Sequence, residues 1–90
     1  MNDDKYKELL LAQLDINNKY CWDRIYEYLD MVIELANGLK EEWSDINAYQ
    51  IRNHVNTMFM KIARLSQNND TINLIKSGKI EDGNKENTDS

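Results

Sequence analysis

The sequence predicts an all-α fold, on three observations. Proline is absent, and glycine occurs only at positions 38, 78 and 83 of the 90 residues. Apolar residues recur three and four positions apart, which is the spacing of one face of an α-helix. No segment shows the period-two alternation and β-branched enrichment of a strand. We therefore expect a small antiparallel helical bundle, in which an N-terminal helix and a short C-terminal helix complete a helical hairpin.

An N-terminal helix is expected over about residues 3–16. Asp3 and Asp4 suit its beginning, because carboxylates there interact favourably with the helix dipole. Its apolar residues recur at four-residue spacing: Tyr6, Leu10 and Leu14. Asn17 and Asn18 predict a break or kink, because asparagine is better suited to helix caps than to helix interiors.

The clearest helical pattern covers residues 22–38. Its apolar positions are Ile25, Tyr28, Leu29, Val32, Ile33, Leu35 and Ala36. Gly38 fits the left-handed residue that ends many helices. The alternative is a helix that continues through Gly38 to Trp43, at a cost of about 1 kcal/mol relative to alanine. In both cases we expect Trp43 to cover the core.

A third helix is expected over residues 46–68, after the capping cluster of Ser44, Asp45 and Asn47. Its apolar residues step by four and three, as in a coiled-coil seam: Ile51, Val55, Met58, Ile62 and Leu65. Phe59 and Ala48 widen this stripe toward a core face. Residues 68–70 (NND) predict its end and the cap of a short helix over residues 71–76, which Gly78 stops.

We expect residues 1–78 to form a single helical domain and residues 79–90 a disordered polar tail. Residues 81–90 (EDGNKENTDS) contain no apolar residue and cannot join a core. Charged residues make up 30% and hydrophobic residues 41% of the chain, which is ordinary for a globular protein. The longest apolar run, LLLA at residues 9–12, is too short to cross a bilayer, so we expect a cytoplasmic protein with no membrane partner.

The net charge of −5 is unevenly distributed. Residues 1–50 hold 11 acidic and 5 basic residues, whereas residues 51–78 hold 1 acidic and 4 basic residues. Helices that pack antiparallel would bring these opposite charges together. The overall balance argues against direct nucleic-acid binding, which needs many accessible lysines and arginines.

Four acidic residues, Asp23, Glu27, Asp30 and Glu34, are spaced 4, 3 and 4 apart along one helix face. Such a row could hold Mg²⁺ for phosphate chemistry, since hard cations prefer carboxylate ligands. The favoured interpretation is a solvated helix face, because residues 46–69 contain no acidic residue that could complete a metal site. His54 and Cys21 have no second histidine or cysteine as a partner, and we expect structural roles for both.

Residues 55–65 (VNTMFMKIARL), followed by Asn69 and Asp70, resemble the lysine-and-arginine helix of small phage-borne all-α domains related to the MazG-type nucleoside triphosphate pyrophosphohydrolases. The segment WDRI at residues 22–25 is similar to the segment that precedes that helix. The resemblance covers about a third of the chain and implies phosphate contacts from Lys61 and Arg64. It further implies that Asp70 joins an acidic cluster near a Mg²⁺-bound nucleotide.

The chain departs from this family pattern where a second aspartate is expected, because it has Asn73 there. The acidic residues of the 22–38 helix also lack the paired-glutamate arrangement of the active enzymes. We therefore expect a non-catalytic relative, with no cofactor. Without the resemblance, Lys61 and Arg64 are adjacent basic residues on a helix surface that solvent or acidic side chains would satisfy.

The leading functional hypothesis is an acidic helical module that binds another protein, as an accessory factor or inhibitor encoded by a phage or mobile element. The predicted contact residues combine carboxylates for a basic partner surface with aromatic anchors: Trp22, Tyr26, Glu27, Asp30, Glu34 and Trp43. Eight aromatic residues are many for so small a core, which leaves a homodimer open. The alternatives are a Mg²⁺-dependent nucleotide-binding or pyrophosphohydrolase domain, which would use Lys61, Arg64 and Asp70, and an inhibitor that mimics DNA phosphates.

Overall fold

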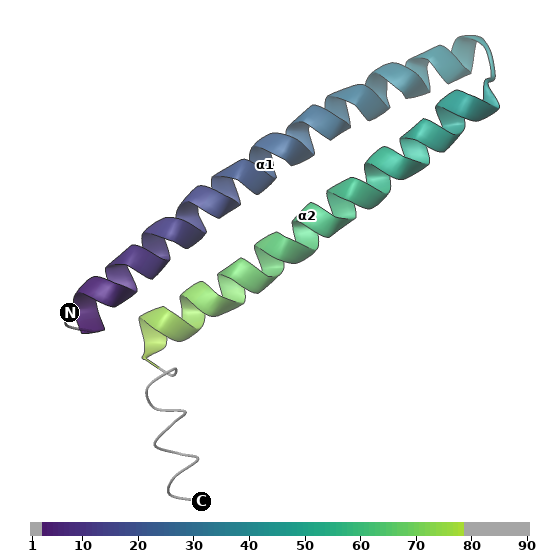
Figure 1. The fold of residues 1–90 in the computed structure, drawn as a ribbon. Helices are drawn as coiled ribbons and strands as arrows, with labels where there is room; N and C mark the ends of the chain where they lie inside the picture. The colour runs from purple at the N-terminus through teal and green to yellow at the C-terminus, as the bar shows by residue number, and fades with distance from the viewer. Residues whose placement is uncertain (1–2, 79–90) are drawn as a thin grey trace, which may run out of the picture.

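The computed structural model describes residues 3–78 and consists of two long helices in this range. Helix α1 covers Asp3–Glu41 and helix α2 covers Asp45–Ser77, and a three-residue connection reverses the chain between them (Figure 1). The predicted all-α class is confirmed, and the described residues contain no strand. The tail expected at residues 79–90 lies outside the described residues.

Helix α2 begins and ends at residues that the sequence identifies. The Ser44 hydroxyl caps its N-terminus by accepting a hydrogen bond from the backbone N–H of Asn47 at 3.3 Å. Gly78 follows its last turn with φ 75°, and its N–H donates to the carbonyl of Ile75. This left-handed conformation favours glycine, which has no Cβ to clash with the backbone. The predicted N-terminal cap at Ser44 and the predicted helix stop at Gly78 are confirmed, although Gly78 ends one long helix and not a separate short one.

The expected break at Asn17 and Asn18 is wrong, because α1 runs through both residues. The reason is a contact 50 residues away: the Asn68 side-chain amide donates to Asn17 Oδ1 at 2.7 Å and to Asn18 Oδ1 at 2.8 Å. The expected end of a helix at residues 68–70 is wrong for the same reason, since Asn68 bonds across the hairpin and α2 continues to Ser77. The separate N-terminal and short C-terminal helices are therefore extensions of two longer ones.

Gly38 does not end the first helix. It lies inside α1, and the backbone N–H of Glu42 donates to its carbonyl at 2.9 Å. The alternative expectation, a helix that continues through Gly38 toward Trp43, is the one that the structure bears out. Because α1 continues beyond Gly38 to Glu41, the chain reverses at residues 42–44.

We call the residues of each helix that face the other helix the seam. On α2 the seam alternates steps of four and three, as in a coiled coil; its members are Asn47, Ile51, His54, Met58, Lys61, Leu65, Asn68, Ile72 and Ile75. Its most buried part is a cluster of Cys21, Ile25 and Leu65, against which Met58 packs. The seam is a single layer of side chains between two helices.

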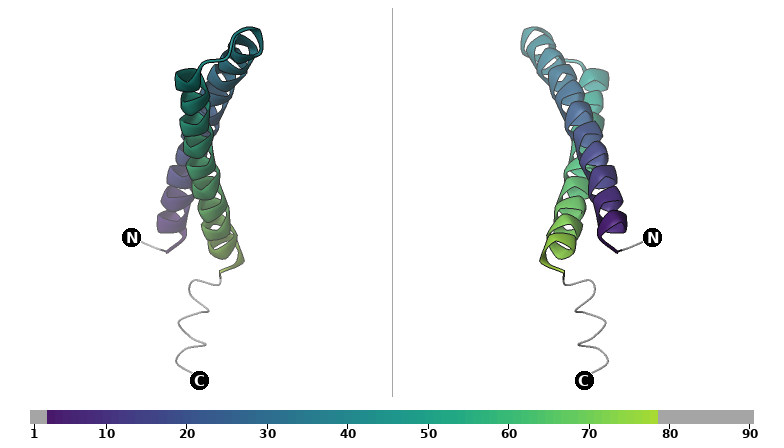
Figure 2. Two further views of the ribbon diagram at one scale, coloured as in Figure 1. Left: turned by 90° about the vertical axis from the view of Figure 1, so that its right-hand side faces the viewer. Right: turned by 90° about the vertical axis from the view of Figure 1, so that its left-hand side faces the viewer.

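This single layer buries little of the chain's apolar surface. The molecule measures 63 × 28 × 15 Å, and only Cys21, Ile25, Leu65 and Ile75 are buried apolar residues among those described. Edge-on views show the helices crossing near their middle and diverging toward both ends (Figure 2). Sixteen large apolar side chains in the described range remain at least 36% exposed.

Trp43 and Phe59, both expected to contribute to the core, are among these exposed side chains. Trp43 does not cover the core: it lies at the chain reversal, is 68% exposed, and donates from Nε1 to Asp45 Oδ1 at 2.7 Å. Phe59 is 63% exposed, because it follows the seam residue Met58 and points away from α1. A hairpin has one interior layer, so residues beside the seam have nothing to cover them.

Candidate protein interaction surface

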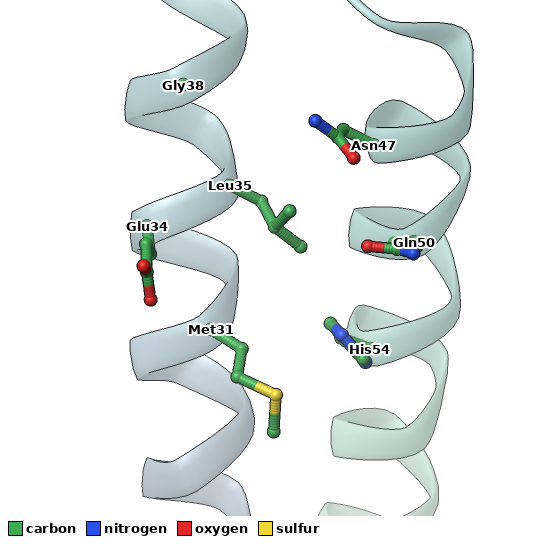
Figure 3. Close-up of a pocket in the computed structure, with 7 residues that line it drawn as sticks. All are labelled: Met31, Glu34, Leu35, Gly38, Asn47, Gln50 and His54. Atoms are coloured by element: carbon green, nitrogen blue, oxygen red, sulfur yellow. The ribbon is translucent and has the colours of Figure 1, made fainter.

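One side of the hairpin is a shallow polar groove between the two helices. Close to the chain reversal it has a volume of about 430 Å³. Its lining residues are Met31, Glu34, Leu35 and Gly38 from α1 and Asn47, Gln50 and His54 from α2. Met31 and Leu35 extend from α1 toward the polar side chains of α2 (Figure 3). We call this side of the hairpin the polar face.

The residues that line this groove indicate which residues of the two helices lie together on the opposite side of the hairpin. On each helix, the residue before a seam position projects to one side of the seam and the residue after it projects to the other. Glu34, before Leu35, and Gln50, before Ile51, both line the polar groove. The residues that follow seam positions, such as Leu29 after Tyr28 and Phe59 after Met58, therefore come together on the other side.

Contacts across the seam fix the relative height of these residues. Asn68 bonds to Asn17, and the ring of His54 lies 5.2 Å from the ring of Tyr28, measured between centroids. Across the side-chain hydrogen bonds and ring contacts between the helices, the numbers of paired residues add up to between 81 and 87. This places Trp22 level with Ile62, and Leu29 level with Val55.

The result is one continuous apolar surface contributed by both helices, which we call the apolar face. Its residues are Trp22, Tyr26, Leu29 and Ile33 on α1 and Val55, Phe59 and Ile62 on α2. The exposed fractions of Trp22, Tyr26 and Phe59 are 50%, 60% and 63%. On α1 the spacing is 4, 3 and 4, and on α2 it is 4 and 3, so each helix carries a second coiled-coil-like stripe beside its seam.

The aromatic rings of the apolar face already contact each other on α1. The ring centroids of Trp22 and Tyr26 lie 6.1 Å apart, with 31° between the ring planes. Side chains spaced i, i+4 are neighbours on a helix surface, so this contact partly orders both rings before a partner binds. Large rigid aromatic side chains of this kind are typical anchors of protein interfaces.

The predicted acidic row lies on the outer surface of α1, and all four carboxylates are exposed. Asp23 pairs with Lys19 at 3.0 Å, and Glu27 pairs with Arg24. Asp23 and Asp30 are three and four residues from Tyr26, so these two members of the row border the apolar face on its α1 side. Of the predicted contact residues, Trp22 and Tyr26 lie in the apolar face and Asp30 lies at its border. Glu27 and Glu34 precede seam positions and lie toward the polar face.

Trp43, the remaining predicted contact residue, is not part of this surface. It follows Trp22 by 21 residues, which is about 32 Å along a helix at 1.5 Å per residue. Its indole lies at the tip of the hairpin, where Asp45 accepts its hydrogen bond. A partner that covers the apolar face would reach Trp43 only by extending to the tip.

The structure separates the residues of the nucleotide-binding alternative. Lys61 and Arg64 line one hollow with Tyr20, over whose ring the Lys61 ammonium lies at 5.2 Å from the centroid. Asp70 lines a different hollow together with Asn73, Leu74 and Ser77. Nine residues separate Asp70 from Lys61, which is two and a half helical turns and places them on opposite sides of α2.

His54 and Cys21 both belong to the seam. His54 contacts the ring of Tyr28, and Cys21 is 2% exposed with its thiol 3.8 Å from Asn17 Oδ1. Within residues 3–78, no three histidine, cysteine or acidic side chains are grouped so that they could hold a metal ion. Neither described helix has a stretch that is long and apolar enough to cross a membrane.

The sequence alone predicts helix-packing or core positions for five residues of the apolar face: Leu29, Ile33, Val55, Phe59 and Ile62. Their periodicity is helical, and periodicity does not say how many partners a helix has. The feature of the sequence that distinguishes these residues from seam residues is the width of the apolar pattern on each helix. Each helix has two parallel 4-3 series, whereas a single partner helix covers only one.

Comparison of the chain with protein-family models, with curated proteins and with solved structures finds no match.

Proposed function

We propose that this protein is a helical interaction module that binds another protein chain by packing helices against its apolar face. The observation that carries the proposal is the apolar face itself, with Trp22, Tyr26 and Phe59 each at least half exposed on one side of the hairpin. Contiguous exposed apolar surface on a water-soluble fold is characteristic of an interaction site. Full burial of each large side chain would contribute about 1.5–3 kcal/mol.

The charges beside the apolar face specify the chemistry of the partner. Asp23 and Asp30 border the face on its α1 side, and all the carboxylates of this row are exposed. A partner with basic residues flanking an apolar helical surface would match both features. Complementary charge at the rim of an interface accelerates association and excludes wrong partners more than it adds affinity.

A pair of photo-crosslinking positions tests this proposal. A photoreactive amino acid replaces Phe59 in one variant of the full chain and Met60 in a matched control. The two side chains are neighbours in sequence and similarly exposed, at 63% and 71%, but only Phe59 belongs to the apolar face. Crosslinked protein is identified by mass spectrometry, in cells that produce the chain and with the purified chain.

We expect a defined protein adduct from position 59 and little from position 60. Equal yields from both positions, or no adduct from either, would contradict the proposal. Release of pyrophosphate from a nucleoside triphosphate in the presence of Mg²⁺, lost on replacement of Lys61 or Arg64, would favour the nucleotide alternative instead.

A further inference from the structure

We propose that the occupant of the apolar face is a second copy of this chain. The two hairpins would pack face to face as a four-helix assembly with both chain reversals at the same end, so that α1 of each copy lies over α2 of the other. This inference rests on the proposed interaction function and names its partner. The polar faces of both copies, with their grooves, remain on the outside.

The charges of the two helices favour this arrangement. Helix α1 carries nine acidic and five basic residues, whereas α2 carries two acidic and four basic residues. Helix α2 of a second copy is therefore a basic helical partner for the acidic α1. Two-fold packing with the reversals at opposite ends would place α1 on α1 and α2 on α2, which brings like charges together. Packing with the reversals at the same end places each helix against two helices of opposite net charge.

The position of the apolar face along the hairpin favours the same arrangement. On α1 the face begins at Trp22, close to the middle of a helix that covers Asp3–Glu41, and it occupies the half nearer the chain reversal. With the reversals at the same end, superposing the two apolar faces also aligns the helices over their full length. With the reversals at opposite ends, superposing the faces would leave the other half of each hairpin without a partner.

Arg52 is the charged residue within the α2 stripe, between Ala48 and Val55 and about two turns before Phe59. In the proposed assembly it faces α1 of the second copy, which has excess negative charge. Arg64 provides a matched comparison, because it is exposed on the same helix but lines the hollow on the polar face.

The first test measures the mass of the full chain in solution by light scattering and sedimentation over a range of concentrations. We expect a dimer that dissociates upon dilution. Phe59→Asp should convert it to a single chain, while Met60→Asp should leave the dimer intact. Because the readout is mass, the result holds even if the separated Phe59→Asp chain loses helicity.

The second test concerns the arrangement of the copies. Arg52→Glu should weaken dimerisation by about tenfold or more, whereas Arg64→Glu should change it by less than about threefold, because only Arg52 faces the second copy. Glu42→Cys, at the chain reversal and in a Cys21→Ala background, should crosslink two copies through a short bismaleimide. With the reversals at opposite ends, the two cysteines would lie roughly 40 Å apart at 1.5 Å per residue, and no crosslink would form.

The outcomes separate this inference from the proposed function. A single-chain mass at all concentrations, together with crosslinking of a different protein from position 59, would overturn the inference and leave the interaction module standing. A single-chain mass without any adduct would overturn both. A dimer that Phe59→Asp does not dissociate, or that fails to crosslink through position 42, would overturn the proposed interface or its orientation.

Discussion

Asn68 is a buried polar side chain in a seam that is otherwise short of buried contacts. It is 7% exposed, and its amide donates to Asn17 and Asn18. Burial of an amide is tolerated when its hydrogen bonds are made, and it is costly when a partner is removed. The buried asparagine therefore links the helices through polar contacts where the adjoining cluster of Cys21, Ile25 and Leu65 links them through apolar ones.

Asn68→Ala should lower the free energy of unfolding by about 1–3 kcal/mol, because it removes two hydrogen bonds from the seam. Asn69→Ala is the matched control, since Asn69 is exposed and accepts only one long bond of 3.4 Å from Asn18. Its effect should stay below about 0.5 kcal/mol. Urea unfolding followed by circular dichroism measures both. An equal decrease in the free energy of unfolding in both variants would show that the buried hydrogen bonds of Asn68 add no stability.

At the scale of the helices, the two described glycines have opposite roles. Gly38 lies inside α1, where a Cβ would meet no atom within 4 Å. Gly78 ends α2 with φ 75°, a conformation that disfavours every residue with a side chain. Replacement by alanine at each position therefore distinguishes a glycine whose lack of a side chain the fold does not need from one whose lack of a side chain it requires.

Gly38→Ala should raise the free energy of unfolding by about 0.5–1 kcal/mol, through the lower backbone entropy of the unfolded chain. Gly78→Ala should lower it by about 1–2 kcal/mol, through strain in the left-handed residue. The difference in thermal midpoint between the two variants measures the contrast. A destabilising Gly38→Ala would mean that the polar groove needs the space that Gly38 leaves open.

The elements also show how far sequence reasoning reaches. Ser44 and Gly78 act through neighbours in the sequence, so local rules identify both. Asn17 and Asn18 are poor interior residues by the same rules, and α1 passes through them because Asn68 satisfies their side chains from a distant position. The apolar periodicity of both helices is visible in the sequence, but its division between the seam and the apolar face depends on how many helices pack together. The apolar pattern of one chain does not determine how many helices pack together.

At the scale of the whole molecule, the hairpin is long and thin, so its stability is expected to vary along its length. The buried cluster of Cys21, Ile25 and Leu65 lies near the middle of both helices, which diverge toward the two ends of the hairpin (Figure 2). Local opening should therefore begin away from the cluster, where fewer apolar contacts hold the helices together.

Hydrogen exchange of the full chain should show its slowest backbone amides at residues 21–25 and 62–68, with faster exchange toward Asp3. Leu65→Ala should remove this maximum, because it truncates a central member of the cluster. Exposed Ile16→Ala, at 66% exposure, is the matched control and should leave the profile unchanged. A uniform profile in the unsubstituted chain would indicate that the hairpin opens as one unit.

The polar seam residues Asn47, His54, Lys61 and Asn68 recur every seven positions on α2. Sliding α2 past α1 by two turns would thus exchange residues of similar kind over much of the seam. Only the asparagine contacts distinguish these alignments. Asn17 and Asn18 would then meet either Ile75, whose side chain has no hydrogen-bond donor, or Lys61, which would bring a charged ammonium to the buried position where Asn68 places a neutral amide. Three amide side chains thereby decide which of several nearly equivalent alignments the molecule adopts.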